Sequence, residues 1–428
     1  MMRRERGIHE IFREDPERAD RELWGRRAFL ANVGAMSAVL GARIVYAQHM
    51  PIGLIPAPLA NTAEPFHIEG KDGLVVLNDR PLSAETPPHL LNDDITPSER
   101  LFVRNNGIPP APARVTRRWT LTVDGESVRR RRRYTVADLE RRFPPTHRQL
   151  VLECAGNGRA AYEPSVAGSQ WTLGAVGCPQ WNGVLLRDVL EDCGVTRDAV
   201  YVAYWGADSH VSGAESGVPI SRGVPVAKAL QRDAMIAWGM NGGPLHPLNG
   251  HPLRLVFGGW PGSTSGKWLR RISIRNVVHD GPKMGGHSYR VPCEPVAPGA
   301  AVAPEDMCII GAMPVKSLIT SPESGARHSF GWPLNVHGHA WVGDGRVRRL
   351  RVSMDFGRTW HRAELWSPAN RGAWANWDFL TRFPTRGYYE IWARAVDDQG
   401  RSQPMVVPGW NPKGYLNNAC HRIAVFVV

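Results

Sequence analysis

The chain has 428 residues, 43% of them hydrophobic and 21% charged, so it is long enough for two or three domains and has the composition of an ordinary globular protein. Its formal net charge of +12 favours anionic ligands, but the basic run Arg129–Arg133 lacks interleaved aromatic residues, so we expect a solvated surface turn and no nucleic-acid binding. None of the six cysteines has CxxC spacing, which argues against zinc ribbons, thioredoxin-like redox pairs and a c-type haem in this chain.

Residues 1–47 predict an export signal. Gly25-Arg26-Arg27-Ala28-Phe29-Leu30 precedes a moderately apolar stretch over residues 31–47, a pattern that resembles a twin-arginine signal peptide. Glycines and an arginine interrupt this stretch, so it is too short for a stable membrane span and we expect no integral span in the mature chain. Cleavage after Ala47 would leave a periplasmic protein.

Residues 48–95 are rich in Pro, Asn and Asp, and we expect an extended N-terminal arm wrapped on the core. Residues 96–295 mix strand and helix patterns, which predicts an α+β catalytic domain without the GxGxxG fingerprint of dinucleotide-binding folds. We expect strands at 119–123, 150–154 and 199–204, helices at 136–142 (capped by Thr135) and 184–193, and further elements at 226–230, 235–238, 253–257 and 269–274.

Residues 291–304 are rich in Pro and Ala and predict a linker, after which the helical periodicity disappears. Short strand patterns separated by turns then run over residues 305–428, which favours an all-β sandwich of immunoglobulin type. If the protein is exported, one or two disulfides are possible. Cys293 and Cys308 form the easiest pair to imagine, although the sequence does not establish this bond.

The most informative motif is Leu150-Val151-Leu152-Glu153-Cys154-Ala155-Gly156-Asn157-Gly158-Arg159. An apolar run ends in a cysteine, small turn-forming residues follow, and a permanent cation stands five residues after the cysteine. This order suits a soft-metal ligand beside an anion site. A lone cysteine at a strand end is more often a buried, inert side chain, but the flanking pattern resembles the molybdenum-binding loop of the sulfite oxidase family.

The resemblance implies a molybdenum–molybdopterin cofactor, with Cys154 as the protein ligand to the metal and the pterin dithiolene supplying two more sulfurs. It also implies that Phe102-Val103-Arg104-Asn105-Asn106 contacts the pterin, with Arg104 in the active site. In the family a His often stands where this chain has Asn106, and another where it has Asn249. The remaining cofactor-binding residues implied by the family pattern are Asp208, Asn249, Arg254 as the phosphate anchor, and the loop residues Ser265, Gly266 and Lys267, whose backbone N–H groups would cradle the cofactor.

The substrate pocket implied by the resemblance contains Arg159, Trp171, Tyr289 and Lys413, together with Arg104. Many family members have Arg where this chain has Lys413, which keeps the charge but loses the two-pronged geometry. Three cations from distant segments suit a small dianion such as sulfite, because a doubly charged anion is costly to desolvate unless fixed charges replace its water.

The resemblance therefore predicts oxidation of sulfite to sulfate, with electrons passed to an external c-type cytochrome, in a protein that forms a homodimer through residues 305–428. One open enzyme alternative is the sulfane dehydrogenase subunit of a thiosulfate-oxidising complex, which shares the fold and the cysteine loop. A methionine sulfoxide reductase is disfavoured, because that branch lacks the C-terminal β domain. A non-catalytic periplasmic module that binds anions or mediates adhesion is the alternative from another class.

Overall fold

The computed structural model describes residues 68–111, 118–212 and 217–428. The export signal expected at residues 1–47 and the first part of the expected arm lie outside the described residues. Among the described helices, none has the length and apolar character needed to cross a membrane.

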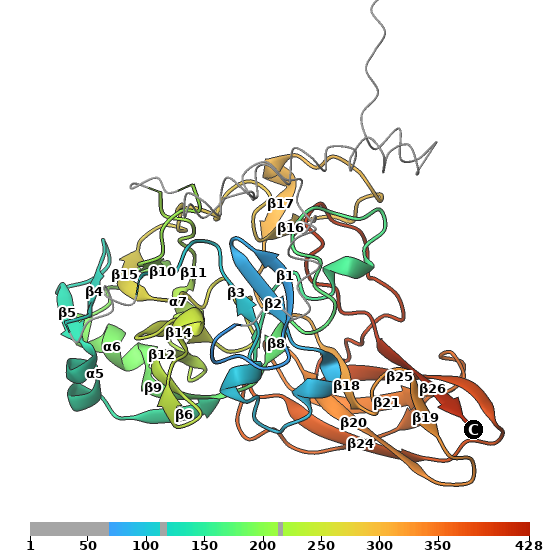
Figure 1. The fold of residues 1–428 in the computed structure, drawn as a ribbon. Helices are drawn as coiled ribbons and strands as arrows, with labels where there is room; N and C mark the ends of the chain where they lie inside the picture. Colours follow the sequence, from blue (N-terminus) through green and yellow to red (C-terminus); the bar gives the residue numbers. More distant parts are fainter. Residues whose placement is uncertain (1–67, 112–117, 213–216) are drawn as a thin grey trace, which may run out of the picture. The chain divides into compact units, whose positions relative to one another are not determined.

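The α+β part contains two sheets with a shared hydrophobic core (Figure 1). The first sheet has the order β11-β10-β15-β4-β5, in which only the β15–β4 pair is parallel. Its strands are β11 (Gly223–Pro225), β10 (Tyr201–Gly206), β15 (Leu269–Arg275), β4 (Thr120–Asp124) and β5 (Arg132–Thr135). The second sheet has the order β13-β12-β9-β6, with β14 also paired to β12. Its strands are β13 (Gly243–Pro244), β12 (Ala234–Met240), β9 (Gln180–Leu185), β6 (Thr146–Gln149) and β14 (Arg254–Phe257).

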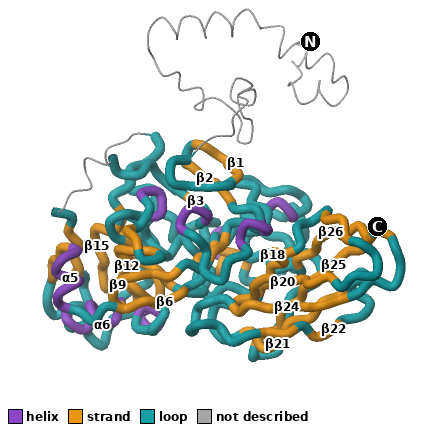
Figure 2. The backbone as a smooth tube through the Cα atoms, turned by 60° about the horizontal axis from the view of Figure 1, so that its bottom comes forward, coloured by secondary structure: helices purple, strands orange, loops and turns teal. Residues whose placement is uncertain are grey.

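Three short helices accompany these sheets: α5 (Val136–Arg142), α6 (Leu186–Cys193) and α7 (Val226–Ala229). Both views place α5 and α6 beside the strands that they cover (Figures 1 and 2). Helix α5 begins where predicted, because Thr135 and Asp138 form a capping box in which each side chain accepts from the other residue's backbone N–H. Leu139 of α5 and Leu190 of α6 are fully buried in the shared core, so each helix buries one apolar face.

The segment expected as an extended arm contains secondary structure in its described part. Strands β1 (Val75–Asp79) and β2 (Leu82–Glu85) form a hairpin, and β2 pairs with β3 (Val103–Arg104). Two further strands, β7 (Leu152–Glu153) and β8 (Val176–Gly177), pair with each other, and β7 ends at the residue before Cys154.

The C-terminal part is mostly β and consists of two sheets around a separate core. One sheet has the order β18-β20-β24-β23: β18 (Lys316–Ser321), β20 (Leu334–Trp341), β24 (Ala375–Thr381) and β23 (Glu364–Leu365). The other has the order β19-β26-β25-β21-β22: β19 (Ala326–His328), β26 (His421–Val427), β25 (Gly387–Asp397), β21 (Val347–Ser353) and β22 (His361–Arg362).

The expected linker is partly ordered as a strand pair. Strand β16 (Arg290–Pro292) pairs with β17 (Met307–Ile309), and the Cys293–Cys308 disulfide joins the two strands at that point. The disulfide that the sequence allowed as a possibility is therefore present, and it closes the loop between the α+β part and the C-terminal part.

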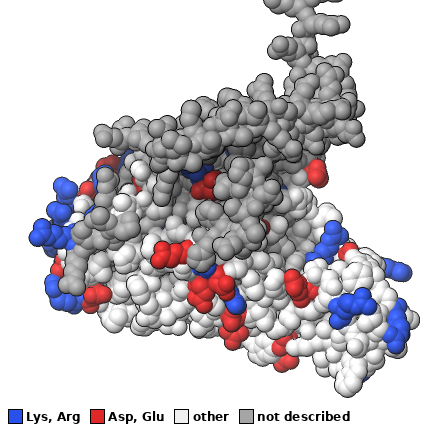
Figure 3. Space-filling view, in the orientation of Figure 1, with Lys and Arg blue, Asp and Glu red and all other residues white. Residues whose placement is uncertain are grey.

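Three sequence predictions need correction. The helix expected from residue 184 begins at Leu186, because residues 180–185 pair with β12 in the middle of the second sheet. The strand expected over 150–154 is only Leu152–Glu153, since the backbone N–H of Val151 donates to Gly372 instead of to a strand neighbour. The Arg129–Arg133 run is not entirely a turn, because Arg132 begins β5. The side chains of this run remain in the basic surface visible beside β4 and β5 (Figures 1 and 3).

Candidate active site

The cysteine loop is a tight turn at the end of β7. The backbone N–H of Cys154 donates to Ala175 at 2.9 Å, and the N–H of Asn157 returns to the Cys154 carbonyl at 2.9 Å. Gly156 is required here, because a Cβ at this position would lie 2.3 Å from the Arg159 guanidinium. The loop thus presents the Cys154 side chain, 8% exposed, to a cavity and packs Arg159 against its own backbone.

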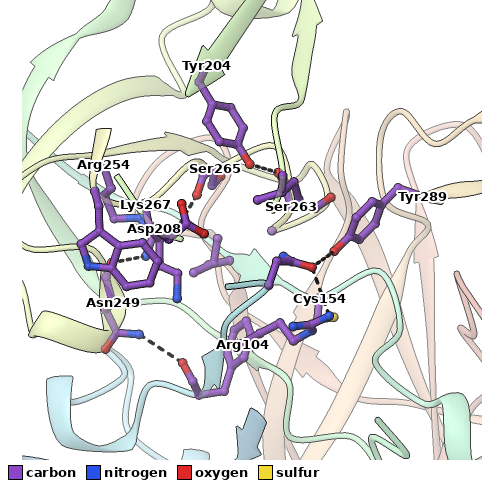
Figure 4. Close-up of a pocket in the computed structure, with 16 residues that line it drawn as sticks. Arg104, Cys154, Tyr204, Asp208, Asn249, Arg254, Ser263, Ser265, Lys267 and Tyr289 are labelled. Atoms are coloured by element: carbon purple, nitrogen blue, oxygen red, sulfur yellow. Dashed lines mark hydrogen bonds between the residues drawn. The ribbon is translucent and has the colours of Figure 1, made fainter. Parts of the chain in front are cut away.

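A cavity lies beside Cys154 (Figure 4). Ten of the residues selected from the sequence line it: Phe102, Arg104, Asn106, Cys154, Asp208, Asn249, Arg254, Ser265, Lys267 and Tyr289. Six other residues, which were not selected individually from the sequence, complete the lining: Leu152, Tyr204, Ile220, Gly262, Ser263 and Trp268.

A second cavity shares Arg104, Asn106 and Tyr289 with the first. It brings Arg104 together with Arg159 and Lys413, three cations from segments more than fifty residues apart in sequence. Lys283 and Tyr415, which were not selected as site residues, also line it. Arg159 is fixed by donating from Nε to the Lys413 carbonyl at 2.8 Å and from Nη1 to the Ser169 carbonyl at 2.8 Å. Its Nη2 has no protein acceptor within the described residues, so this cavity can bind a small anion.

Tyr289 and Arg104 meet at Asn106, the position where the family often has His. The Tyr289 hydroxyl donates to Asn106 Oδ1 at 3.1 Å, and Arg104 Nη2 donates to the same oxygen at 3.2 Å. Since an amide oxygen only accepts, the hydroxyl proton of Tyr289 points at Asn106 in this arrangement. Tyr289 also has φ of 52°, a left-handed backbone that a bulky residue seldom adopts and that often marks a functional position.

Tyr289 lies inside a stack of four side chains. Its ring is parallel to that of Tyr415 with centroids 5.6 Å apart, the Arg222 guanidinium lies 4.7 Å from the Tyr289 ring, and the Arg159 guanidinium lies 5.3 Å from the Tyr415 ring. Such cation–π contacts orient the rings as well as the guanidinium groups. Arg222 is 1% exposed and donates from Nη1 to Ser263 Oγ at 2.6 Å, so it connects the stack to the first cavity.

Three cations gather at the other end of the first cavity. Lys71 donates to the carbonyls of Ser98 and Leu101 at 2.6 and 2.9 Å and to Asn249 Oδ1 at 2.6 Å. Arg254 donates to the carbonyls of Leu255, Asn249 and Ser265, and Lys267 donates to the Leu248 carbonyl and to Asn105 Oδ1. All of these acceptors are neutral; among the described residues, the carboxylates that oppose this positive charge are Asp208, which acts on Lys267, and Glu99, which acts on Lys71.

Burial changes the ionisation of this group of side chains. Desolvation lowers the pKa of Lys71 to about 7 and that of Arg254 to about 9, and it lowers the pKa of Lys267 well below its usual value, with the Arg254 charge acting in the same direction. Desolvation also raises the pKa of Asp208 to about 6, against the opposing effect of Lys267. An anionic ligand in this cavity would relieve the mutual repulsion of the cations, so the side chains present fit a phosphate-bearing cofactor.

Four of the residues selected from the sequence do not line either cavity. Trp171 is fully buried beside Phe102, at 6.3 Å between ring centroids, and its Nε1 has no hydrogen-bond acceptor among the described residues. Val103 and Asn105 are buried behind the first cavity. The backbone N–H groups of Ser265 and Gly266 donate within their own loop, to Gly262 and Thr264, so the Ser265 side chain and not these N–H groups faces the cavity.

Comparison with known proteins gives matches over both parts of the chain. Residues 108–283 match the family model of the oxidoreductase molybdopterin binding domain, and residues 307–428 match that of the Mo-co oxidoreductase dimerisation domain. The chain is 34% identical to sulfite oxidase from Gallus gallus over 362 residues, covering 82% of this chain and 77% of the relative. It is also 34% identical to mitochondrial sulfite oxidase from Homo sapiens over 391 residues, covering 87% of this chain and 69% of the relative.

Among solved structures, the sulfane dehydrogenase SoxCD from Paracoccus pantotrophus is similar, with a TM-score of 0.66 and 26% identity over 89% of this chain and 92% of that chain. An NADH nitrate reductase from Phaseolus vulgaris is 32% identical, but this chain spans only 41% of its length.

Proposed function

Because this chain belongs to the sulfite oxidase family of molybdenum–molybdopterin oxidoreductases, we propose that it oxidises sulfite to sulfate. The observation that carries the proposal is the adjacency of the two cavities: a cysteine and buried cations line the first, three further cations surround the second, and the cavities share Arg104, Asn106 and Tyr289. A cofactor in the first cavity and a small dianion in the second would therefore be neighbours.

The cofactor supplies the two-electron redox chemistry when it is bound. Cys154 would bind the metal through its sulfur, because a thiolate is the soft ligand available at this position. Arg254, Lys267 and Asn249 would hold the phosphate end, and Asp208 would accept hydrogen bonds from the pterin. Within the described residues, the hydrogen-bond acceptors around Lys71, Arg254 and Lys267 are neutral, which supports this assignment because an anionic group would compensate their charge.

The substrate would be held by Arg104, Arg159 and Lys413. Fixed cations that replace the hydration shell of a dianion allow it to enter a partly buried site at low cost. Tyr289 lines the same cavity, and its hydroxyl proton is directed at Asn106. Trp171 would support the wall of the first cavity from behind, through Phe102.

We further propose a periplasmic location after twin-arginine export, an external c-type cytochrome as electron acceptor, and a homodimer formed through an immunoglobulin-like C-terminal domain. The match to a dimerisation domain over residues 307–428 supports the dimer. The Cys293–Cys308 disulfide supports export, because such bonds persist in oxidising compartments.

The test is elemental analysis followed by turnover. Purified protein should contain one molybdenum per chain and reduce ferricyanide or a c-type cytochrome only when sulfite is added. Cys154→Ser should abolish this turnover. Protein that contains molybdenum but reduces no acceptor with sulfite would contradict the proposal, and protein without molybdenum would favour a non-catalytic anion-binding or adhesion module.

Sulfane dehydrogenase activity is a second candidate, favoured by the structural similarity to SoxCD. The higher identity to sulfite oxidases leads us to place sulfite first. The two functions separate when the same preparation is assayed with free sulfite and with a protein-bound sulfane as alternative electron donors.

A further inference from the structure

Glu153 immediately precedes the cysteine, and its carboxylate is buried at the boundary between the α+β part and the C-terminal part. It is 1% exposed. Its Oε1 accepts from Lys316 Nζ at 2.5 Å and from Asn157 Nδ2 at 3.1 Å, and its Oε2 accepts from Trp341 Nε1 at 2.9 Å. Lys316 belongs to β18 and Trp341 to β20, so two of the three donors come from the C-terminal sheet.

The same carboxylate also fixes the turn that follows it. Asn157, which donates to Glu153, accepts the Ala175 N–H on its Oδ1 at 3.1 Å and closes the turn back to the Cys154 carbonyl. Ala175 in turn accepts the N–H of Cys154. Asn157 and Ala175 therefore connect the Cys154 backbone to the Glu153–Lys316 ion pair through a chain of hydrogen bonds.

Other C-terminal residues hold the flanks of the loop. The Leu416 N–H donates to the Ala155 carbonyl at 2.9 Å, Asn417 Nδ2 donates to the Gly158 carbonyl at 2.8 Å, and the Gly372 carbonyl accepts the Val151 N–H at 2.8 Å. The loop between Val151 and Gly158 is thus bound on both sides by residues of the matched dimerisation domain.

We infer that Glu153, Lys316 and Trp341 are positioning residues for the Cys154 sulfur, so that the C-terminal domain shapes the metal site in addition to any role in dimerisation. This inference rests on the proposed role of Cys154 as the metal ligand. The physical reason is that a carboxylate buried with a cation and an indole N–H has one low-energy position, and the loop attached to it inherits that position. Removing one partner leaves a buried carboxylate without its counter-charge, so the Glu153 side chain and the loop attached to it lose their single preferred position.

The experiment compares Lys316→Met with Lys228→Met in purified holoenzyme. Lys228 is a matched control, because it is equally buried, forms a 3.0 Å ion pair with Asp233, and lines neither cavity. Three quantities are measured: molybdenum per chain, the sulfur-to-metal charge-transfer absorption, and the rate at which iodoacetamide alkylates Cys154, located by mass spectrometry. The other free cysteines, Cys178, Cys193 and Cys420, are buried and serve as internal references for general unfolding.

We expect Lys316→Met to change the charge-transfer spectrum and to speed Cys154 alkylation about tenfold, which corresponds to about 1.4 kcal/mol of loop-opening free energy. Lys228→Met should lower the melting temperature without either effect. Lys316→Arg should restore the wild-type spectrum, and Trp341→Phe, which removes only the indole donor, should give an intermediate alkylation rate.

The inference is overturned when Lys316→Met and Lys228→Met give the same Cys154 alkylation rate and the same spectrum. It is also overturned when all four free cysteines of Lys316→Met react equally faster, because that result would indicate global destabilisation. Wild-type protein that binds molybdenum and protects Cys154 but does not oxidise sulfite would contradict the proposed function and leave this inference standing.

Discussion

Lys71 shows what single residues contribute beyond the sequence motifs. It lies far ahead of the cysteine loop, and nothing in its local sequence distinguishes it from a surface lysine. Only the fold brings its ammonium group to Asn249, where the family commonly has His. Asn249 and Arg254 could be selected from a motif because their neighbours are diagnostic, whereas Lys71 could not, because its role depends on a contact between segments 178 residues apart.

The lowered pKa of Lys71 predicts a pH dependence of stability. Its pKa of about 7 in the folded chain lies below the ordinary value of 10.5, so between these values the unfolded chain binds more protons than the folded chain. The free energy of unfolding of cofactor-free protein should therefore rise with pH from about 7 toward 10, relative to Lys71→Met. Urea unfolding of both proteins across this range measures the difference, and parallel pH profiles would contradict the assignment.

Lys413 predicts how charge at the substrate cavity affects affinity. A hydrogen bond to a charged group contributes about 1.5–3 kcal/mol, so Lys413→Met should raise the KM for sulfite by about tenfold or more with a smaller change in kcat. Lys413→Arg should keep KM within a few-fold of wild type, because the charge remains. Steady-state kinetics with Arg141→Gln, an exposed arginine of α5 that lines neither cavity, provides the control. An unchanged KM in Lys413→Met would remove this lysine from the site.

At the scale of elements, local signals predicted some boundaries and tertiary pairing decided others. The capping residues Thr135 and Asp138 lie within four consecutive positions of the sequence, so the predicted start of α5 was correct. Helix α6 lacks a side-chain cap, and the apolar run before it fits a buried strand as well as a helix. Val184 pairs with Ile236 in β12, so this run is a strand. A single sequence does not specify such pairing between distant segments.

The capping box of α5 predicts a measurable loss of stability. Thr135→Ala removes the side-chain oxygen that accepts the Asp138 N–H, and such a substitution costs about 1 kcal/mol. The melting temperature should fall by a few degrees while the KM for sulfite stays unchanged, because α5 lines neither cavity. Thr135→Ser, which keeps the acceptor, should be close to wild type. A loss in Thr135→Ser equal to that in Thr135→Ala would show that the cap oxygen is not responsible.

The disulfide between β16 and β17 predicts a larger effect. It closes a loop with a sequence separation of 15 residues, for which the chain-entropy estimate is about 3 kcal/mol. The Cys293→Ala/Cys308→Ala double variant should therefore unfold at lower urea concentration than wild type under oxidising conditions. In the presence of a reductant, wild type should approach the variant. Equal unfolding midpoints under both conditions would mean that the bond contributes nothing.

For the whole molecule, the sequence identified the parts of the site but not their layout. Ten of the sixteen selected residues line the first cavity, and Arg159 and Lys413 line the second, because each belongs to a motif with a chemical reason for its residue type. Trp171 lies behind the wall of the first cavity instead of in it. Arg222 and Tyr415, which were not selected from the sequence, complete the stack around Tyr289. Distances between motifs in sequence do not specify which side chains share a surface, so packing had to supply that information.

The net charge of +12 predicts that ionic strength controls substrate capture. A cationic cavity in a positively charged protein attracts a dianion over distances comparable to the Debye length, about 10 Å at 0.1 M salt. Raising the ionic strength from 0.01 to ~0.2 M should therefore raise the KM for sulfite, with little effect on kcat. Rates measured in sodium salts of different anions separate this screening from competition by the added anion for the cavity. A KM that is independent of ionic strength would indicate that contacts inside the cavity alone determine capture.

The enclosed side chains of Lys71, Lys267 and Arg254 near Asn249 also affect how a cell distinguishes cofactor-loaded from cofactor-free molecules. Without a bound anion, this corner of the protein contains mutually repelling groups, and burial in the same place favours protonation of the nearby Asp208. Filling the site stabilises the native chain by mass action, so empty copies open more often than filled ones. Proteolytic surveillance that samples open states would then remove unfilled copies selectively, and the charge arrangement itself would act as the checkpoint.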